Sequence, residues 1–444
     1  MPEPISLRPW DQALVRMPIL PVGAALAVLA DRDAALEHLA STADIRRALA
    51  VSSMDLVDAL DRPTASAKRQ QRAQSSLLRY VMRMATRPTP FGTSATVALA
   101  RFGQVTDLEP DGLAVRTQTR VDLEWLAGLV QAAEERPEIR RRLRFRTHPA
   151  MFQRGGRVVL ASREPRIGTH PQAVSVRATR VLARALIRAS QPVLYRDLAE
   201  DLLVATPGAT PERVADLLDT LWRQTLLVSE LWPPMTTEDP AVHVLSVLDK
   251  IDEAQDLAAG LREIQAATAE FDAGGVDGSV QRYRHILRLA HALSAHGSTR
   301  PTVTDSCVPL RGRNINVVVG REAARAASLL LQLSSMPAGP AWIAAWRQAF
   351  VERYGTDRSV PVVEALDPMV GVGPPQERLA WSALPPVVAA RRDGVLTHLA
   401  ASALAQGRLE VDLDDRLLGE LRTWSSLSAH PESVDINEPF RATG

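Results

Sequence analysis

One short stretch limits what this chain can fold into, because residues 79–92 (RYVMRMATRPTPFG) pass from a helical pattern into two prolines. Residues 66–85 contain no proline or glycine, and their apolar side chains recur at the three-and-four spacing of one helical face. The prolines disfavour the α region for the residues before them, Arg87 and Thr89. We therefore predict a long helix that ends at a stiff bend.

Arg79 and Arg83 lie opposite the apolar face of this predicted helix, and Arg87 lies at the bend. A guanidinium makes planar, bidentate contacts to phosphate or carboxylate, so three of them beside a rigid turn predict an anion site. The alternative is a solvated arginine face, because the helix macrodipole favours cations near a C-terminus. The spacing alone does not separate these two interpretations.

The same stretch resembles a signature of the lantibiotic dehydratase family, in the form Arg83-x-x-x-Arg87-Pro88-Thr89-Pro90-Phe91-Gly92. Three further blocks resemble that family in the same order. They are residues 13–21 (ALVRMPILP), residues 120–126 (RVDLEWL), and a late block within residues 354–374 that contains Asp367-Pro368 and Gly371-Val372-Gly373-Pro374. The four blocks span most of the chain, which is thereby identified as a member, in the N-terminal glutamylation region of the family.

The resemblance implies a reaction and a set of site residues. Family members convert Ser and Thr hydroxyls of a ribosomally made precursor peptide to glutamate esters, taking the glutamyl group from glutamyl-tRNA. By resemblance, Arg83, Arg87 and Thr89 contact donor and acceptor, while Asp122 and Asp305 orient groups or accept a proton. The resemblance implies no cofactor, because glutamyl-tRNA is a co-substrate.

Two acids therefore have alternative interpretations. Asp122 precedes a predicted helix over residues 122–135, where an acid is explained by N-capping alone. Asp305 ends a short predicted strand, residues 302–305, and is the second acidic candidate through the resemblance alone. Residues 113–121 alternate between apolar or threonine side chains and arginine or glutamine, which predicts a half-exposed strand that leads into Asp122.

Arginine is dense in residues 136–146 (RPEIRRRLRFR). A basic run beside an aromatic residue is able to bind an RNA backbone. A solvated helix end is the other interpretation.

Residues 148–235 have the pattern of a winged-helix-like unit. A hairpin with a glycine turn over residues 152–160 precedes three predicted helices, residues 176–189, 194–203 and 211–225, and a closing strand. The third helix carries acids where DNA recognition favours cations, whereas the family uses such a unit to bind a precursor's leader as an added strand. Its candidate lining residues, which are equally suited to a core, are Leu217, Leu221 and Trp222.

The predicted fold class is α+β and multi-domain, with mixed helices, antiparallel sheet and the inserted winged-helix-like unit. We expect the first part of the glutamylation region in residues 1–147, the leader-binding unit in residues 148–235, and a second part in residues 236–444. Two helices are predicted within residues 31–60, with Ser41 or Thr42 as a cap between them. Further helices are predicted over residues 242–271 and 280–296.

Composition limits the remaining chemistry. The net charge of +1 excludes a bulk attraction to nucleic acid, and Cys307 is the only cysteine, which favours a reducing, cytoplasmic compartment. No Walker motif, Gly-x-Ser-x-Gly elbow, paired-cysteine zinc motif or His-Glu-x-x-His is present, so no metal is expected. No apolar run is long enough to span a bilayer.

Three functions remain open. The first is a glutamylating subunit that binds the precursor through its leader and needs a partner to complete the region beyond Gly444 or to eliminate glutamate; a truncated copy is the alternative, and a homodimer is allowed. The second is a precursor-binding scaffold without catalysis. The third is a ligase that extends a peptide from aminoacyl-tRNA.

Overall fold

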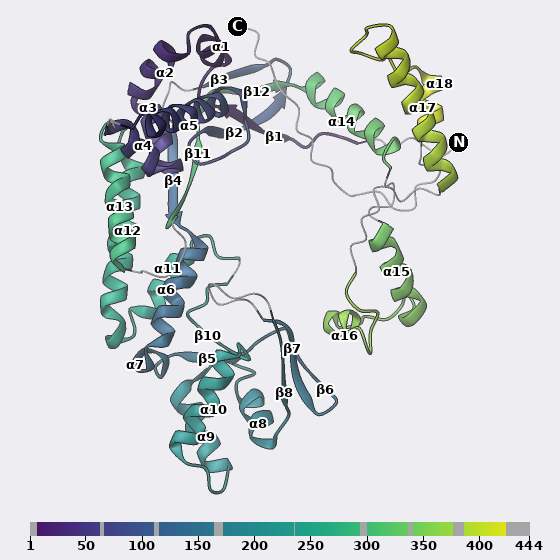
Figure 1. Ribbon diagram of the computed structural model, residues 1–444. Helices are drawn as coiled ribbons and strands as arrows, with labels where there is room; N and C mark the ends of the chain where they lie inside the picture. Colours follow the sequence, from purple (N-terminus) through teal and green to yellow (C-terminus); the bar gives the residue numbers. More distant parts are fainter. Residues whose placement is uncertain are drawn as a thin grey trace. The chain divides into compact units, whose positions relative to one another are not determined.

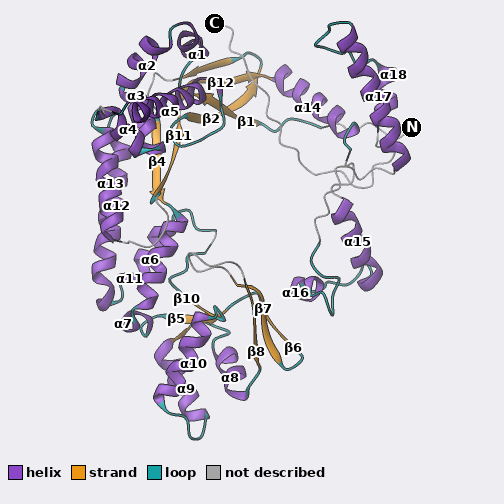
Figure 2. Cartoon of the chain, in the orientation of Figure 1, coloured by secondary structure: helices purple, strands orange, loops and turns teal. Residues whose placement is uncertain are grey.

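The computed structural model describes residues 7–62, 66–110, 115–163, 172–234, 236–293, 300–335, 341–375 and 386–422. The chain divides into two compact units. Unit 1 contains Met1–Ala13, Leu99–Leu108 and Gly312–Gly444, and unit 2 contains Leu14–Ala98 and Glu109–Arg311. Helices combined with parallel and antiparallel strands confirm the predicted α+β class (Figure 2).

Five helices open unit 2 after strand β1 (Gln12–Pro18). They are α1 (Val22–Ala30), α2 (Arg32–Ser41), α3 (Ala43–Ser52), α4 (Met54–Asp61) and α5 (Ala67–Thr86), and they gather in one cluster (Figure 1). The prediction of two helices in residues 31–60 was wrong, because Ser53 interrupts the pattern and its hydroxyl accepts the N–H of Leu56 at 3.3 Å. Thr42 occupies the predicted cap position, but its hydroxyl donates to the carbonyl of His38 at 3.3 Å instead.

Helix α5 confirms the long predicted helix. Leu77, Val81, Met84 and Ala85 are buried on one face, while Arg79 on the opposite side is exposed. The apolar spacing therefore sets which face of α5 packs onto the core of unit 2.

Strand pairing in unit 2 joins three distant segments. Strand β11 (Thr302–Cys307) runs antiparallel to β4 (Arg116–Val121), and Cys307 pairs in parallel with Val97 of β2 (Ala95–Gly103). On β4, Thr119 and Val121 are buried while Arg116 and Gln118 are exposed, which confirms the predicted alternation. In unit 1, β12 (Leu310–Asn316) pairs in parallel with the end of β2. Strand β3 (Asp107–Pro110) lies beside β12 in the sheet.

After β4, the chain forms α6 (Leu123–Glu135) and α7 (Pro137–Arg140), followed by elements close to those predicted for residues 148–235. Strand β5 (Arg144–Thr147) lies between β9 (Val193–Leu194) and β10 (Leu227–Ser229) in one sheet; β7 (Arg157–Arg163) lies between β6 (Met151–Arg154) and β8 (Gln172–Arg177) in another. The helices of this segment are α8 (Arg180–Arg188), α9 (Tyr195–Ala205) and α10 (Pro211–Arg223).

The predicted start of its first helix at residue 176 was wrong. Val176 pairs with Val158 in the β7–β8 ladder, and α8 begins only after Thr179, whose hydroxyl accepts the N–H of Leu182 at 3.2 Å. The glycine hairpin of β6 and β7 is confirmed, with Gly155 and Gly156 at positive φ. The winged-helix assignment and the domain limits at 147 and 235 stay predictions.

Between β10 and β11, the elements that the structure describes are helices. The helix predicted over residues 242–271 is two helices, α11 (Pro240–Leu248) and α12 (Gln255–Ala273), because the chain turns Ile251 and Ala254 into the core between them. Helix α13 (Ser279–Leu293) packs on α12, with the rings of Phe271 and Tyr283 5.4 Å apart. The main hydrophobic core, from Val28 to Ala290, lies within unit 2.

Unit 1 contains α14 (Val317–Gln332), α15 (Ala341–Tyr354), α16 (Val362–Leu366), α17 (Pro386–Ala405) and α18 (Asp415–Leu421). Its late glycine block forms a tight turn. The buried Asp367 carboxylate accepts the N–H groups of Met369 and Val370 at 2.7 and 3.1 Å, and a Cβ on Gly371 would lie 1.9 Å from the carbonyl oxygen of Glu364. Glycine is therefore required at 371 by the close approach of two backbone segments.

Candidate functional site

The bend after α5 is fixed by its backbone. Arg87 leaves the helix with φ −120° and ψ 114°, as Pro88 requires, and Gly92 takes a left-handed φ of +55°. The N–H of Leu20 donates to the carbonyl of Met84 at 3.0 Å, which ties the last turn of α5 to the segment after β1. The predicted stiff corner is confirmed.

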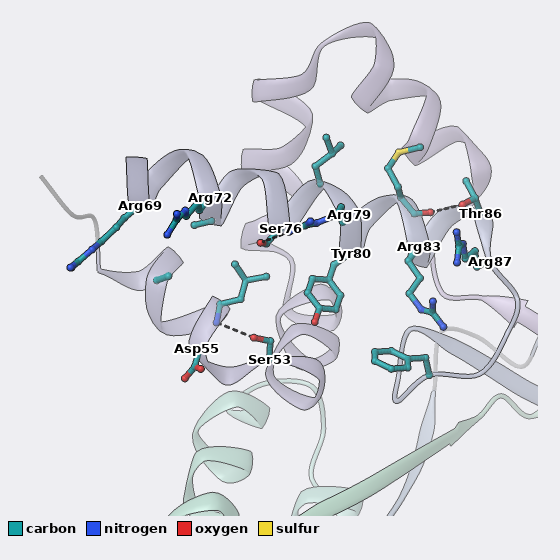
Figure 3. Close-up of a pocket in the computed structure, with 16 residues that line it drawn as sticks. Ser53, Asp55, Arg69, Arg72, Ser76, Arg79, Tyr80, Arg83, Thr86 and Arg87 are labelled. Atoms are coloured by element: carbon teal, nitrogen blue, oxygen red, sulfur yellow. Dashed lines mark hydrogen bonds between the residues drawn. The ribbon is translucent and has the colours of Figure 1, made fainter. Parts of the chain in front are cut away.

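A groove of about 1030 Å³ runs along α5 to this corner. Its second wall is formed by Ser53 and the start of α4 (Figure 3). Phe91, which follows the bend, also lines the groove. Arg79, Arg83 and Arg87 all line it, so the structure brings together the three arginines that the sequence singled out. Thr89 is exposed and does not line the groove.

The sequence reasoning missed several groove residues. Lining side chains that no motif indicated are Ser53, Asp55, Arg69, Arg72, Ser76 and Tyr80. Arg69 and Arg72 lie on the same helix face as the three predicted arginines, toward the start of α5. Helical periodicity could therefore have indicated them. The wall formed by α4 is a tertiary contact that no local signal predicts.

The groove arginines are not neutralised. Within the described parts of the chain, no carboxylate lies within 4.0 Å of the guanidinium of Arg69, Arg72, Arg79, Arg83 or Arg87. Arg79 donates to the hydroxyl of Ser76 at 3.1 Å, and the guanidinium of Arg83 lies 4.5 Å from the centre of the Phe91 ring. The Nε of Arg83 is buried without a hydrogen-bond partner. Cations held beside an open groove in this way are suited to binding anions.

The basic run at residues 136–146 differs in this respect. Arg136 pairs with Asp256 at 2.8 Å, the buried Arg140 pairs with Asp219 at 2.7 Å, and Arg142 pairs with Glu253 at 3.0 Å. Arg136 and Arg142 are paired at the exposed surface, whereas Arg140 is paired and buried, so all three guanidiniums are held by acids of their own unit.

Asp122 is the N-cap of α6. Its Oδ1 accepts the N–H groups of Glu124 at 2.9 Å and Trp125 at 3.1 Å, which confirms the capping interpretation. No contact places it in the groove.

Replacing Asp122 separates its two interpretations. Because Asn caps as well as Asp, Asp122→Asn should leave thermal unfolding near the wild type, whereas Asp122→Ala should lose about 1 kcal/mol. If the carboxylate also takes part in the glutamyl transfer that the resemblance implies, Asp122→Asn should lower the rate of that transfer at unchanged stability. Full transfer by the Asn variant would limit Asp122 to capping.

Asp305 lies on the exposed side of β11, where its Oδ2 accepts a hydrogen bond from Nη1 of Arg120 at 2.5 Å. Asp305 pairs in register with Gln118, whereas Asp122 follows Val121, the partner of Thr302. At about 3.4 Å per residue, the two acids are separated by roughly 14 Å along the ladder. They do not act on one atom in this arrangement.

The opposite face of β4 and β11 carries a polar network that the sequence did not indicate. Asp272 of α12 accepts hydrogen bonds from the hydroxyls of Thr117 and Thr119 at 2.7 and 2.8 Å and from the N–H of Thr119 at 2.6 Å. Arg47 donates to the Thr117 hydroxyl at 2.6 Å, and burial lowers the pKa of this arginine, an effect that Asp272 opposes. The network fixes the strands whose exposed side holds Arg120 and Asp305.

The candidate leader-lining residues are mainly core. Leu221 and Trp222 are buried, and the indole N–H of Trp222 donates to Oε2 of Glu134 at 3.1 Å. Leu217 is half-buried against the same core.

Gly92 offers a test of the corner. A Cβ there would lie 3.1 Å from Cγ1 of Val51 and would force a non-glycine residue to φ +55°, whereas Gly155 at φ +53° has nothing within 4 Å. Left-handed backbone costs non-glycine residues roughly 1–2 kcal/mol. Gly92→Ala should therefore lower the free energy of unfolding more than Gly155→Ala in matched denaturant titrations. Equal losses in the free energy of unfolding would mean that the Val51 side chain moves aside without an energetic cost.

The described residues contain neither a metal cluster nor a membrane-spanning helix. No group of three or more His, Cys, Asp or Glu side chains is placed to hold a metal ion there, and none of the helices described is both long enough and apolar enough to cross a membrane.

The chain is similar to several known proteins. The family model described as "Lantibiotic dehydratase, N terminus" matches residues 41–438. The subtilin biosynthesis protein SpaB of Bacillus subtilis is 26% identical over 383 residues, which cover 83% of this chain and 36% of SpaB. The nisin biosynthesis protein NisB of Lactococcus lactis subsp. lactis is 20% identical over 311 residues, covering 69% of this chain and 30% of NisB.

Two solved structures share the fold. The tRNA-dependent lantibiotic dehydratase MibB from Microbispora sp. 107891 superposes with a TM-score of 0.76 and 29% identity, covering 94% of this chain and 40% of MibB. The glutamylation domain TbtB from thiomuracin biosynthesis superposes with a TM-score of 0.57 and 22% identity, covering 90% of this chain and 52% of the TbtB chain. This chain thus spans well under half the length of the curated relatives it matches.

Proposed function

The chain belongs to the lantibiotic dehydratase family, in its N-terminal region, and from that premise we propose that it transfers glutamate from glutamyl-tRNA to Ser or Thr hydroxyls of a ribosomally made precursor peptide. The resulting ester makes the hydroxyl oxygen a better leaving group for a later elimination. We assign that elimination to a partner subunit.

One observation carries the proposal: the arginine groove is open and its cations lack internal carboxylate partners in the described residues. Glutamyl-tRNA brings two kinds of anion, the phosphates of the tRNA and the free side-chain carboxylate of its glutamate. Arg83 and Arg87 at the bend are suited to bidentate contacts with such groups, and Arg79 lies one helical turn away.

The chemistry requires positioning more than activation, because the ester of glutamyl-tRNA is already reactive. The peptide hydroxyl oxygen attacks the ester carbonyl carbon, the bond from that carbon to the ribose oxygen breaks, and the hydroxyl proton ends on the ribose oxygen. Fixed cations near the carbonyl stabilise the negative charge that develops on its oxygen. Thr89, Asp122 and Asp305 remain proposed as groups that orient the acceptor or carry the proton.

We propose that residues 148–235 bind the leader of the precursor. The sheet β6-β7-β8 has two outer strands, and an extended peptide adds to such an edge through backbone hydrogen bonds. Of the candidate lining residues, Leu217 retains partial exposure, whereas Leu221 and Trp222 support the fold from within.

Mass spectrometry tests the proposal. A precursor peptide is incubated with the protein, its partner subunit, tRNA, glutamyl-tRNA synthetase and glutamate. A gain of one glutamyl unit on a Ser or Thr side chain supports it. Peptide binding without a change in mass would instead indicate a scaffold, and extension of the peptide terminus would indicate a peptide ligase.

A further inference from the structure

The groove on α5 continues well beyond the three arginines at the bend. Arg69 and Arg72 line its far end, and both are exposed. Figure 3 shows them on the same helix as Arg83 and Arg87, toward its opposite end. At about 1.5 Å per residue, Arg69 and Arg83 are roughly 21 Å apart along the helix, which is far longer than one amino acid.

The far end has the chemistry of a phosphate-binding surface. Neither Arg69 nor Arg72 has a carboxylate within 4.0 Å in the described chain, whereas Arg136, Arg140 and Arg142 are each paired with an acid. Exposed, unpaired arginines along one helix face attract a polyanion.

Aromatic side chains distinguish a nucleic acid from an acidic peptide as the occupant. Tyr80, which is half-buried, and Phe91, which is exposed, line the same groove as the arginines. A positively charged groove that also presents aromatic rings is the usual surface for a single nucleic acid strand, whose bases stack while its phosphates meet cations.

We propose that Arg69 and Arg72 bind phosphates of the acceptor end of tRNA while its aminoacyl ester lies at Arg83 and Arg87. This rests on the proposed function and adds a division of the groove into an ester end and a phosphate end. Point-charge contacts suffice at the phosphate end, so lysine should replace arginine there.

Equilibrium binding tests the division without requiring turnover. The full chain is titrated into two labelled probes: full-length glutamate tRNA, and an amide-linked glutamyl-adenosine that carries no phosphate. The Arg69→Ala/Arg72→Ala variant should bind the tRNA roughly tenfold more weakly at low salt, with a log–log salt slope smaller by about 1.4–1.8. Its affinity for glutamyl-adenosine should stay unchanged, and Arg69→Lys/Arg72→Lys should restore tRNA binding.

A matched control removes two other exposed helix arginines, Arg32 of α2 and Arg288 of α13. The Arg32→Ala/Arg288→Ala variant has the same net charge and should bind tRNA as the wild type does. An Arg69→Ala/Arg72→Ala variant that keeps wild-type tRNA affinity, or that loses no more than this control, overturns the inference and leaves the proposed function standing. An acidic peptide that displaces tRNA only when Arg69 and Arg72 are present would assign this end to a peptide. A wild-type chain that binds neither probe contradicts the proposed function itself.

Discussion

Arg83→Ala and Arg87→Ala should each reduce glutamyl transfer by roughly 100-fold or more while leaving precursor binding unchanged. Both guanidiniums line the groove at the proline-locked bend, and neither has a carboxylate partner within the described residues. Removing either one takes away a cation that a bound anion would meet directly. Single-turnover transfer and peptide binding are measured on the same preparations.

Lysine variants sharpen this test. Lysine supplies charge but not the planar fork of arginine, so Arg83→Lys and Arg87→Lys should recover little transfer if the contacts are bidentate. Arg288→Ala, on α13, is the control for a lost surface charge. If transfer and precursor binding fall together in the Arg83 or Arg87 variants, the separation of the two sites is wrong.

Arg140→Ala should have the largest effect on stability, on the order of 3–5 kcal/mol, because it breaks a buried ion pair from one side. Arg140 donates to both carboxylate oxygens of Asp219 at 3.1 and 2.7 Å and to the carbonyl of Glu134 at 2.7 Å. Its guanidinium also lies 4.4 Å from the centre of the Trp222 ring. The substitution leaves Asp219 without its cation and removes the link between α7 and α10.

Tyr195 also contacts Asp219, the partner of Arg140. Its hydroxyl donates to Asp219 at 3.1 Å, and burial together with that carboxylate raises the pKa of Tyr195 to about 12. A raised pKa means that the neutral phenol contributes stability, which is complete below its unfolded pKa of about 10 and is lost as pH rises toward 12. Tyr195→Phe should therefore flatten the alkaline fall in stability.

Denaturant unfolding measures the Arg140 effect against a close control. Arg142 lies two residues after Arg140 and is an exposed partner of Glu253. Arg142→Ala should therefore change the free energy of unfolding little. Arg140→Ala/Asp219→Ala should lose less than the sum of its single variants, because the second substitution removes the uncompensated charge. A small effect of Arg140→Ala would mean that water replaces the pair without cost.

Local signals predicted the parts of the fold that depend on neighbouring residues. The prolines at 88 and 90 set the end of α5, its apolar spacing set the buried face, and Asp122 was found as an N-cap because capping involves only the next three residues. The alternation of buried and exposed side chains along β4 likewise followed from the two-residue repeat of a β-strand.

Interactions between distant residues were not predictable in this way. Arg136 and Arg142 meet acids more than one hundred residues away, and Asp272 meets threonines about 150 positions earlier. Three arginines of the groove, Arg79, Arg83 and Arg87, could be named from the sequence. The wall formed by α4 and the distance of Asp305 from Asp122 depend on tertiary packing. The break between α3 and α4 at Ser53 was not predicted, because the helical pattern of the sequence continues through the N-cap of α4.

We propose above that the open arginine groove holds the aminoacyl end of glutamyl-tRNA. Calorimetric titration of amide-linked glutamyl-adenosine into the wild-type chain and into Arg83→Ala/Arg87→Ala tests this placement. We predict saturable binding to the wild type and its loss in the double variant, with both proteins equally stable. Equal affinity for the two proteins would contradict the claim, because the ligand would then be held somewhere other than the bend.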